Sequence, residues 1–391
     1  MSQIDLFNSI TNVGAAADSG QEADCTSVCR HSSKPNVIGS QLHRFPYLWN
    51  LKDAVFTKDK GKVFSCFACG GGSTMGYKLA GFDVIGCNEI DPKMIEAYKA
   101  NHNPKYAFLE PIQTFKDRQD LPDELYQLDI LDGSPPCSSF SMAGNREKDW
   151  GKEKVFREGQ AEQVLDTLFF DFIDLAKRLQ PKVVIAENVK GLLMGNAKHY
   201  YRKVHKELKA AGYSVTAILA DASKMGVPQK RERVFVIGVR LDIAEKLNFA
   251  NVNVPEIDLK FNEPEILFEE INDFEDSSIE QKKAGRVELW AKCKPGEQFS
   301  KYHPKGHYFA DYKLKYTDIV PTITASIGDG AWHPDYCRLL NRKELCCAGT
   351  YPQDYNFQDN GEQYLIGMSV PPLMTAHIAS EVFGQWLSKL G

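Results

Sequence analysis

A glycine-rich turn between an apolar strand and a helical pattern constrains the fold of this chain more than any other feature. Residues 62–67 form an apolar run typical of a strand, and the glycines of residues 70–72 precede a helical pattern over residues 74–80. Glycine lets the backbone approach a ligand closely, and a helix start favours a negative group. The next predicted strand, residues 83–88, leads into Glu89, where an acid in a doubly wound fold binds ribose hydroxyls. Together they predict a site for an adenosine-containing cofactor.

Two further apolar runs carry reactive side chains to the carboxyl edge of the predicted sheet. The run 129–133 is followed by two prolines and Cys137, and the run 182–186 leads into Glu187. Open α/β sheets bind their ligands at this edge, so we interpret Cys137 as a nucleophile. The alternative on this stretch alone is a small buried hydrophobe, the commoner state of a free cysteine. An acid after a fully apolar strand is costly unless it is paired or functional.

Two connections in the predicted domain carry many charged residues. Residues 138–162 form a long charged connection directly after Cys137, which we predict to be a lid, with a solvated loop as the alternative. Arg231 and Arg233 alternate as the chain enters the predicted strand 234–239, so both are expected on one face. For each arginine, the alternative to a role in the reactive site is a phosphate contact or a structural ion pair.

The composition is that of a soluble globular protein. Hydrophobic residues make up 43% and charged residues 25% of the 391 residues, and no apolar run approaches the length of a membrane span. The N-terminus lacks a secretory signal, and ten irregularly spaced cysteines favour a reducing compartment, so we expect a cytoplasmic protein. Cys25, Cys29 and His31 have no second ligand pair at a usual spacing, so no metal site is expected.

The net charge of −5 is unevenly distributed along the chain. Residues 256–280 hold ten acidic residues against one lysine, whereas residues 281–317 hold nine Lys or Arg against three acids. Local fields decide phosphate contact, so the basic half is a candidate nucleic-acid interface, with a solvated face as the alternative.

Several short motifs follow one another in a fixed order over roughly residues 62–240 and 318–385. The motifs are Phe67-Ala68-Cys69-Gly70-Gly71, Glu89, Pro135-Pro136-Cys137, Glu187-Asn188-Val189, Gln229-Lys230-Arg231-Glu232-Arg233, Pro321-Thr322-Ile323-Thr324, Arg338-Leu339-Leu340 with Tyr351-Pro352, and Gly367-Met368-Ser369-Val370. Their order and spacing resemble those of the cytosine-5 DNA methyltransferase family, of bacterial or phage type.

The resemblance implies an α/β fold, a Rossmann-like S-adenosylmethionine-dependent methyltransferase core with a smaller target-recognition domain. We expect an N-terminal extension over 1–60, a catalytic domain over 61–240 and 318–391, and a target-recognition domain over 241–317. The implied enzyme is a DNA (cytosine-5-)-methyltransferase that methylates a flipped-out cytosine in a specific duplex sequence through a covalent Cys137 adduct. Its implied partners are double-stranded DNA and a cognate restriction endonuclease, with the chain itself a monomer and no membrane contact.

The resemblance also assigns residues to each part of the site. The implied catalytic residues are Cys137 as the nucleophile and Glu187, which would hold and protonate ring nitrogen 3 of the cytosine. Arg233 would contact the exocyclic oxygen, and Arg231 would lie close by in support. The implied cofactor-binding residues are Phe67, Ala68, Gly70, Gly71, Glu89, Ile90, Glu110, Pro136, Leu168 and Ser369. The implied DNA-binding residues are Ser141, Gln229, Lys301, Tyr302, His303 and Lys305.

Three positions depart from the family pattern. Cys69 replaces the first glycine of the loop, Glu110 stands near the position of an aspartate, and Met368 replaces an asparagine before Ser369. Each departure concerns cofactor binding, and none removes a catalytic group. The alternatives are a cytosine-5 RNA methyltransferase, a degenerate methyltransferase acting as a DNA-binding regulator, and a nicotinamide oxidoreductase, which would leave Cys137 unused.

Overall fold

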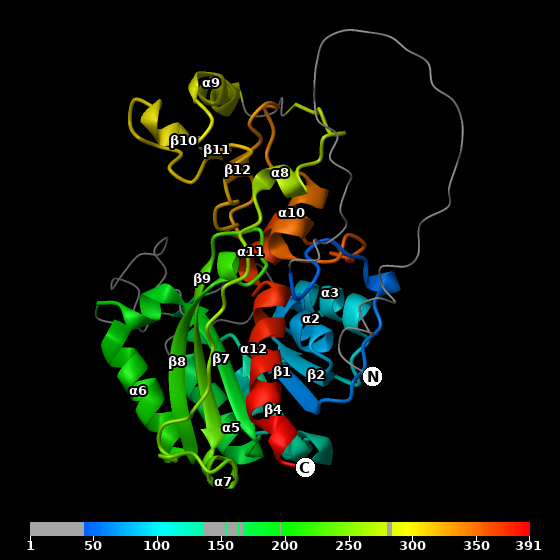
Figure 1. The fold of residues 1–391 in the computed structure, drawn as a ribbon, viewed down its shortest axis with the longest axis vertical. Helices are drawn as coiled ribbons and strands as arrows, with labels where there is room; N and C mark the ends of the chain where they lie inside the picture. Colours follow the sequence, from blue (N-terminus) through cyan, green and yellow to red (C-terminus); the bar gives the residue numbers. More distant parts are fainter. Residues whose placement is uncertain (1–42, 137–152, 155–162, 165–166, 196, 280–283) are drawn as a thin grey trace.

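The computed structural model describes residues 43–136, 153–154, 163–164, 167–195, 197–279 and 284–391. Its centre is a seven-stranded sheet in the order β3-β2-β1-β4-β7-β9-β8 (Figure 1). Pairs from β3 to β7 run parallel, and β9 runs antiparallel to β7 and β8. The strands are β1 (Lys62–Cys66), β2 (Asp83–Glu89), β3 (Tyr106–Leu109), β4 (Ile130–Gly133), β7 (Val183–Val189), β8 (Tyr213–Asp221) and β9 (Glu232–Arg240).

The strand order reverses beside β1. The chain proceeds outward from β1 to β2 and β3, and then returns to place β4 on the other side of β1. In an open α/β sheet, the crevice at such a reversal lies outside the carboxyl ends of the strands and is where ligands bind. The predicted Rossmann-like core is confirmed.

Helices cover both faces of the sheet. Along β7, Val183 and Ile185 belong to one buried apolar cluster, whereas Val184 and Ala186 belong to the other. Burial on both faces explains why this strand is apolar throughout rather than alternating. The helices of the large domain are α2 (Gly72–Leu79), α3 (Pro92–His102), α4 (Ile112–Phe115), α5 (Leu168–Leu179), α6 (Ala197–Ala210), α7 (Leu241–Lys246), α10 (Arg342–Gly349), α11 (Glu362–Met368) and α12 (Pro372–Gln385).

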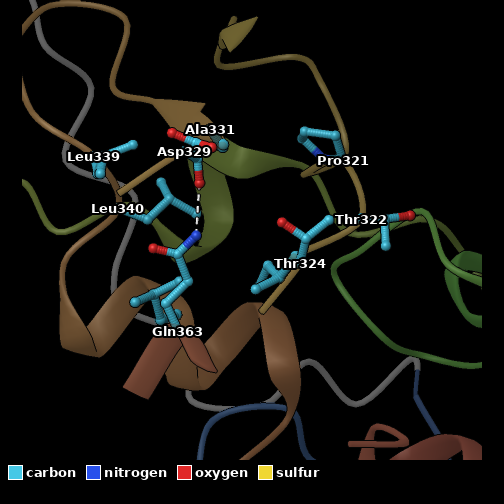
Figure 2. A pocket seen from close by; sticks show the side chains of 11 residues that line it. Pro321, Thr322, Thr324, Asp329, Ala331, Leu339, Leu340 and Gln363 are labelled. Atoms are coloured by element: carbon cyan, nitrogen blue, oxygen red, sulfur yellow. Dashed lines mark hydrogen bonds between the residues drawn. The ribbon is translucent and has the colours of Figure 1, made fainter. Parts of the chain in front are cut away.

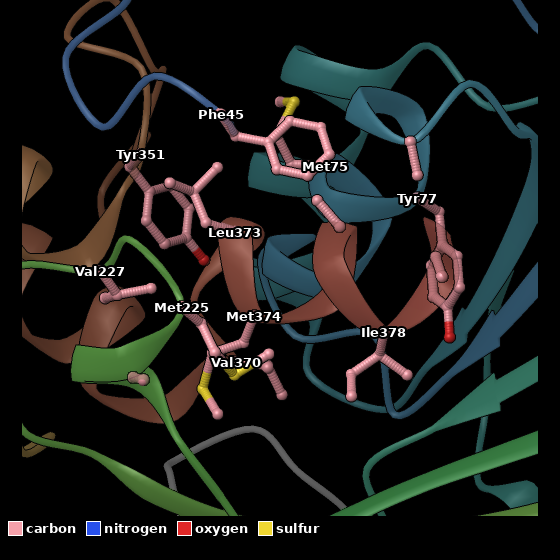
Figure 3. Packing of buried hydrophobic residues seen from close by; sticks show 14 of the residues in the cluster. Phe45, Met75, Tyr77, Met225, Val227, Tyr351, Val370, Leu373, Met374 and Ile378 are labelled. Carbon is pink, nitrogen blue, oxygen red and sulfur yellow. The ribbon is translucent and has the colours of Figure 1, made fainter. Parts of the chain in front are cut away.

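The C-terminal helix α12 packs against α2, although the two are far apart in the sequence (Figure 3). Leu373 and Met374 of α12 lie in the same buried cluster as Met75 of α2. Phe45 joins this cluster from the first described segment. The first described segment, residues 43–58, therefore packs on the large domain, and within this range the structure places only a short 3-10 turn, Leu51–Asp53.

A smaller unit stands at one end of the molecule (Figure 1). It contains α9 (Ala284–Lys292) and a sheet of β10 (Glu297–Gln298), β11 (Tyr312–Lys313) and β12 (Ala331–Trp332). Its apolar cluster joins Phe299 to Trp332 and Cys337, which lie beyond the expected boundary at residue 317. Conversely, Phe249, Ile257 and Phe261 pack against the core of the large domain. Residues 241–317 are therefore not one packed unit, because apolar contacts rather than the charge pattern divide the chain.

The short helix α8 (Phe268–Ile271) packs in the apolar cluster of the large domain. Strands β5 (Glu153–Lys154) and β6 (Gln163–Val164) pair with each other in a separate two-stranded sheet. The rest of the predicted lid over residues 138–162, and Cys25, Cys29 and His31, lie outside the described residues. Within the described part of the chain, no helix combines the length and apolar character that a membrane crossing requires.

Candidate active site

Two of the predicted catalytic side chains, those of Glu187 and Arg233, lie at the carboxyl edge of the sheet. β4 leads into Pro135 and Pro136. β7 carries Glu187 two residues before Val189, which is the ladder partner of Arg233. Because β9 is antiparallel to β7, its first residues lie at this same edge. Cys137 follows Pro136 directly and lies outside the described residues.

Glu187 and Arg233 form an ion pair across β7 and β9. Nε of Arg233 lies 2.9 Å from Oε1 of Glu187, with side chains 15% and 12% exposed. Burial lowers the pKa of Arg233, and the Glu187 carboxylate opposes this effect. A largely desolvated pair that keeps some access to solvent can bind a polar ring edge, since the carboxylate and the guanidinium have further acceptor and donor capacity. The structure thus brings together two of the four predicted catalytic side chains.

Arg231 has a different environment from Arg233. Its guanidinium donates to the carbonyl oxygens of Ile323 (2.9 Å), Gly367 (2.9 Å) and Ser369 (2.8 Å). Burial and the neighbouring Arg233 lower the pKa of Arg231 to about 9. β9 begins at Glu232, so Arg231 precedes the strand and the expected alternation of the two arginines does not start there. The Arg231 side chain therefore ties together backbone segments, and its supporting role in catalysis stays a prediction.

Gln229 is buried, and the predicted DNA contact is wrong for this residue. Its side chain is 1% exposed; Nε2 donates to the carbonyl of Ala348 over 3.0 Å and Oε1 accepts from the N–H of Ile323 over 3.1 Å. A buried amide must find such partners because leaving it unpaired costs free energy. Gln229 therefore anchors the segment after residue 320 to the large domain.

The loop after β1 adopts backbone conformations that favour glycine. Phe67 and Cys69 have φ values of 52° and 47°, and Gly71 has a φ of 95°. A Cβ on Gly71 would overlap Nε2 of His102, so this glycine is required by packing as well as by conformation. The departure at Cys69 therefore puts a side chain in the left-handed region. Burial and the Glu89 carboxylate raise the pKa of the Cys69 thiol, which keeps it protonated.

Glu89 ends β2 and holds the loop through its carboxylate. Oε2 accepts from the N–H of Cys69 over 2.7 Å, and Oε1 accepts from the N–H groups of Ile90 and Asp91 over 2.9 Å each. Burial raises the pKa of Glu89, and the three donors oppose that effect. Each carboxylate oxygen has two lone pairs, so capacity for hydroxyl donors remains.

The residues around Glu89 fit an adenosine-bearing cofactor. Phe67, in the loop after β1, and Ile90, next to Glu89, are partly exposed apolar side chains. Together with the acceptor oxygens of Glu89, they make the combination of apolar surface and hydroxyl acceptor that suits a nucleoside. Ala68 is buried at the base of the loop, and Gly70 is held by Tyr355, whose hydroxyl donates to its carbonyl. Sequence reasoning missed Tyr355, because nothing in its local pattern indicates a contact 285 residues away.

The other predicted cofactor residues differ in accessibility. Glu110 is partly exposed and pairs with Arg118 over 2.9 Å, and Pro136 is partly exposed at the end of β4. Leu168 is fully buried at the start of α5, so its contacts are with the protein core. The hydroxyl of Ser369 donates to the carbonyl of Leu365 over 2.8 Å, which closes the end of α11.

Four predicted DNA-binding residues lie on or beside a short 3-10 turn of the smaller unit, Phe299–Lys301. Lys301 and Tyr302 both contact the carboxylate of Glu297, and Lys301 holds the pKa of that carboxyl down to about 2. His303 stacks on His307 at 4.9 Å, and Nδ1 of His303 accepts from the N–H of Lys305 over 3.3 Å. Ser141 lies outside the described residues.

A pocket of about 310 Å³, partly open to solvent, lies where the smaller unit joins the large domain (Figure 2). Thr322 and Thr324 line it together with Gln363 of α11. Nε2 of Gln363 donates to the carbonyl of Asp329 over 2.6 Å, so α11 braces the loop that leads to β12. The pocket is separate from the Glu187–Arg233 pair, which does not line it.

Comparison with known proteins relates the chain to DNA methyltransferases. Type II methyltransferase M.NgoPII of Neisseria gonorrhoeae is 36% identical over 188 residues, 48% of this chain and 50% of that protein. M.FnuDI of Fusobacterium nucleatum is 34% identical over 219 residues, 56% and 57% of the two chains. M.BspRI of Lysinibacillus sphaericus is 27% identical over 386 residues, with 84% and 82% covered. The alignments to the first two relatives thus span about half of their lengths.

Solved structures agree on the fold. Spodoptera frugiperda DNMT2 superposes with a TM-score of 0.56 at 17% identity, covering 82% of this chain and 99% of that one. S. pombe Dnmt2 gives 0.54 at 14% identity, with 82% and 98% covered. The model of one family, the C-5 cytosine-specific DNA methylases, matches residues 61–384, which include every described group of the site. The chain belongs to the C-5 cytosine-specific DNA methylase family.

Proposed function

We propose that this protein is a DNA (cytosine-5) methyltransferase that uses S-adenosylmethionine and a covalent Cys137 adduct. The observation that carries the proposal is the Glu187–Arg233 ion pair, at the same sheet edge as the two prolines that precede Cys137. This edge therefore presents a carboxylic acid and a guanidinium next to the position where a cysteine nucleophile enters. Membership of the C-5 cytosine-specific DNA methylase family supports the same reaction.

The chemistry follows from the target ring. Carbon 5 of cytosine is a poor nucleophile, so the Cys137 thiolate adds to carbon 6 and turns carbon 5 into an enamine carbon. Glu187 holds and protonates ring nitrogen 3, while Arg233 donates to the exocyclic oxygen, which stabilises the charge that develops. When bound, S-adenosylmethionine supplies the electrophilic methyl group. Loss of the carbon 5 proton to a base and expulsion of the Cys137 thiolate restore the aromatic ring.

The cofactor site in this proposal is the loop after β1 together with Glu89. Glu89 would accept from ribose hydroxyls, with Phe67 and Ile90 against the adenine and Pro136 beside the reacting end. Phe67, Cys69 and Gly71 have positive φ in the loop between β1 and α2, and α2 begins directly after this loop at Gly72. A helix start next to a carboxylate suits the mixed charge of an amino acid group.

The target base must leave the duplex to reach Cys137, because neither face of a stacked ring is accessible. We propose that Ser141 and the connection over 138–162 close over the flipped base, and that Lys301, Tyr302, His303 and Lys305 contact DNA from the smaller unit. The relatives carry Type II methyltransferase names, so the proposal includes a restriction endonuclease that acts on the same sequence. The proposal also includes a monomeric chain and a cytoplasmic location.

Trapping on a fluorinated base tests the reaction. Fluorine at carbon 5 cannot leave as a proton, so duplex DNA containing 5-fluorocytosine should form a stable covalent complex in the presence of S-adenosylmethionine. Cys137→Ser should abolish the complex, while Cys346→Ser, at a buried cysteine of α10 outside the proposed site, should retain it. An adduct with RNA and none with any DNA would favour the RNA methyltransferase alternative. Bisulfite sequencing of a host that expresses the protein would identify the target sequence.

A further inference from the structure

The outer face of α6 carries a cluster of cations that the proposed chemistry does not use. Lys198, Arg202, Lys206 and Lys209 are all exposed, and we call them the α6 basic face. At 3.6 residues per turn, these four side chains fall within about a quarter of the helix circumference. The opposite face, Ala197, Tyr200, Val204 and Leu208, is buried in the core of the large domain. The charge is therefore concentrated on one stripe of a helix that is firmly packed.

The α6 basic face has no acidic partner among the residues that the structure describes, where ion pairs are recorded for many other lysines and arginines. Lys198, Arg202 and Lys206 follow one another at spacings of four residues, so like charges are neighbours on the helix. Each such pair costs about 0.2–0.5 kcal/mol of helix stability. The only acid in α6 is Glu207, in a protein whose overall net charge is −5. Folding alone does not account for this arrangement, whereas an anionic partner would.

The helix starts next to the candidate active site. β7, which carries Glu187, leads through a 3-10 turn, Lys190–Leu193, directly into α6. Lys198 therefore lies near the carboxyl edge of the sheet, and the α6 basic face extends away from that edge. From Lys198 to Lys209 the helix rises about 16 Å at 1.5 Å per residue. At 3.4 Å per base pair, this equals about five base pairs of duplex.

We propose that the α6 basic face binds the phosphate backbone of duplex DNA that flanks the target site. This inference rests on the proposed function, because the flanking DNA is placed by a target held at the sheet edge. Lysine and arginine at the surface are the groups that neutralise phosphates without reading sequence. A membrane surface does not fit as the partner, since the apolar side of α6 is buried and none of it can enter a bilayer.

Duplex length separates flanking contacts from contacts at the target. The quadruple variant Lys198→Gln, Arg202→Gln, Lys206→Gln, Lys209→Gln removes the charges and keeps helix-forming side chains. A second variant removes the same charge from exposed lysines outside α6: Lys177→Gln, Lys246→Gln, Lys260→Gln, Lys389→Gln. Fluorescence anisotropy would measure binding to labelled duplexes of about 14 and about 40 base pairs with one central sequence, in KCl from about 50 to about 300 mM.

For the long duplex, the salt dependence of log K in the α6 variant should become shallower by about 3 to 4 units, since each phosphate contact contributes about 0.9. The short duplex should bind both variants and the unmodified protein alike. Equal slopes for the α6 variant and the unmodified protein on the long duplex would overturn the inference, as would an equal loss in the control variant or on the short duplex. A change seen only with RNA of the same length would also overturn it. No binding of either duplex by the unmodified protein would instead count against the proposed function.

Discussion

The N–H of Cys69 lies 2.7 Å from Oε2 of Glu89, and this bond joins the loop after β1 to the acid at the end of β2. The departure at Cys69 and the predicted ribose-binding acid are thus parts of one local structure. The bond orients the Glu89 carboxylate while Cys69 holds a φ of 47°. Changes at either residue should therefore affect cofactor binding before they affect the chemical step.

Cys69→Gly should stabilise the protein slightly. The left-handed conformation costs a non-glycine residue about 1–2 kcal/mol, which the substitution removes. Glycine also has more conformational freedom in the unfolded chain, which favours unfolding by about 0.5–1 kcal/mol and offsets part of the stabilisation. We expect the free energy of unfolding, measured with urea, to increase by up to about 1 kcal/mol. Gly71→Ala is the matched control and should destabilise, because its φ is 95° and its Cβ would overlap His102. A destabilised Cys69→Gly protein would show that the thiol contributes packing that outweighs the backbone cost.

Glu89→Gln should weaken S-adenosylmethionine binding. The amide can accept hydrogen bonds at one oxygen only, whereas the carboxylate serves three N–H groups through two oxygens. One or more donors then lose their partner at a cost of about 1–3 kcal/mol. Isothermal titration calorimetry should give an affinity reduced by about 10- to 100-fold, with kcat at saturating cofactor changed much less. A reduced kcat with unchanged affinity would remove Glu89 from the cofactor site.

Arg231→Lys and Arg233→Lys should separate stability from catalysis. Arg231 donates to three carbonyl oxygens, and a lysine ammonium cannot reproduce that planar geometry. We expect Arg231→Lys to lower the free energy of unfolding by about 2–4 kcal/mol, as for other broken buried networks. Arg233→Lys should keep the stability and lower kcat/KM for duplex DNA by about 100-fold or more. The same loss of stability in both variants would mean that Arg233 is structural as well.

Asp132→Asn should change the pH dependence of stability. Burial raises the pKa of Asp132 to about 7, although the hydroxyls of Ser65 and Tyr77 donate to its carboxylate. A carboxyl with a raised pKa in the folded state binds more protons when folded, so its contribution to stability falls as pH rises from about 4 to 7. The slope is at most about 1.4 kcal/mol per pH unit. Asp132→Asn should remove this decline in urea titrations from about pH 5 to 8, and an unchanged profile would contradict the assignment.

Tyr355→Phe should act through the glycine loop. The hydroxyl of Tyr355 donates to the carbonyl of Gly70 and lies 3.2 Å from Nε2 of His102. Loss of this hydrogen bond should raise KM for S-adenosylmethionine by about 3- to 30-fold at nearly constant kcat, as expected when the ground state and the transition state lose the same binding free energy. Tyr126→Phe serves as the control, since that exposed hydroxyl contacts only Arg178 on the surface. A KM that does not move would leave Tyr355 with a packing role alone.

The strands and the position of Glu187 could be predicted because they depend on local patterns. Apolar runs bounded by glycine and proline marked β1, β4, β7 and β9 to within a few residues. The different roles of Arg231 and Arg233 could not be predicted, because they depend on carbonyl groups of residues 323, 367 and 369. The burial of Gln229 and the contact from Tyr355 to Gly70 depend on the same long-range packing. The smaller unit was misplaced because Trp332 packs against it across the expected boundary.

The packing of α12 on α2 has a consequence for synthesis on the ribosome. Domains generally fold as units while the chain is synthesised, so a domain needs all of its packed elements before it can fold. Here the buried face of α2 is completed only by Leu373, Met374 and their neighbours, after the whole smaller unit has been made. A nascent chain that stops before α12 would expose that apolar face, and chaperones or proteases would be expected to recognise it. The order of the chain thus delays a complete cofactor-binding domain until nearly all of the described chain has been translated.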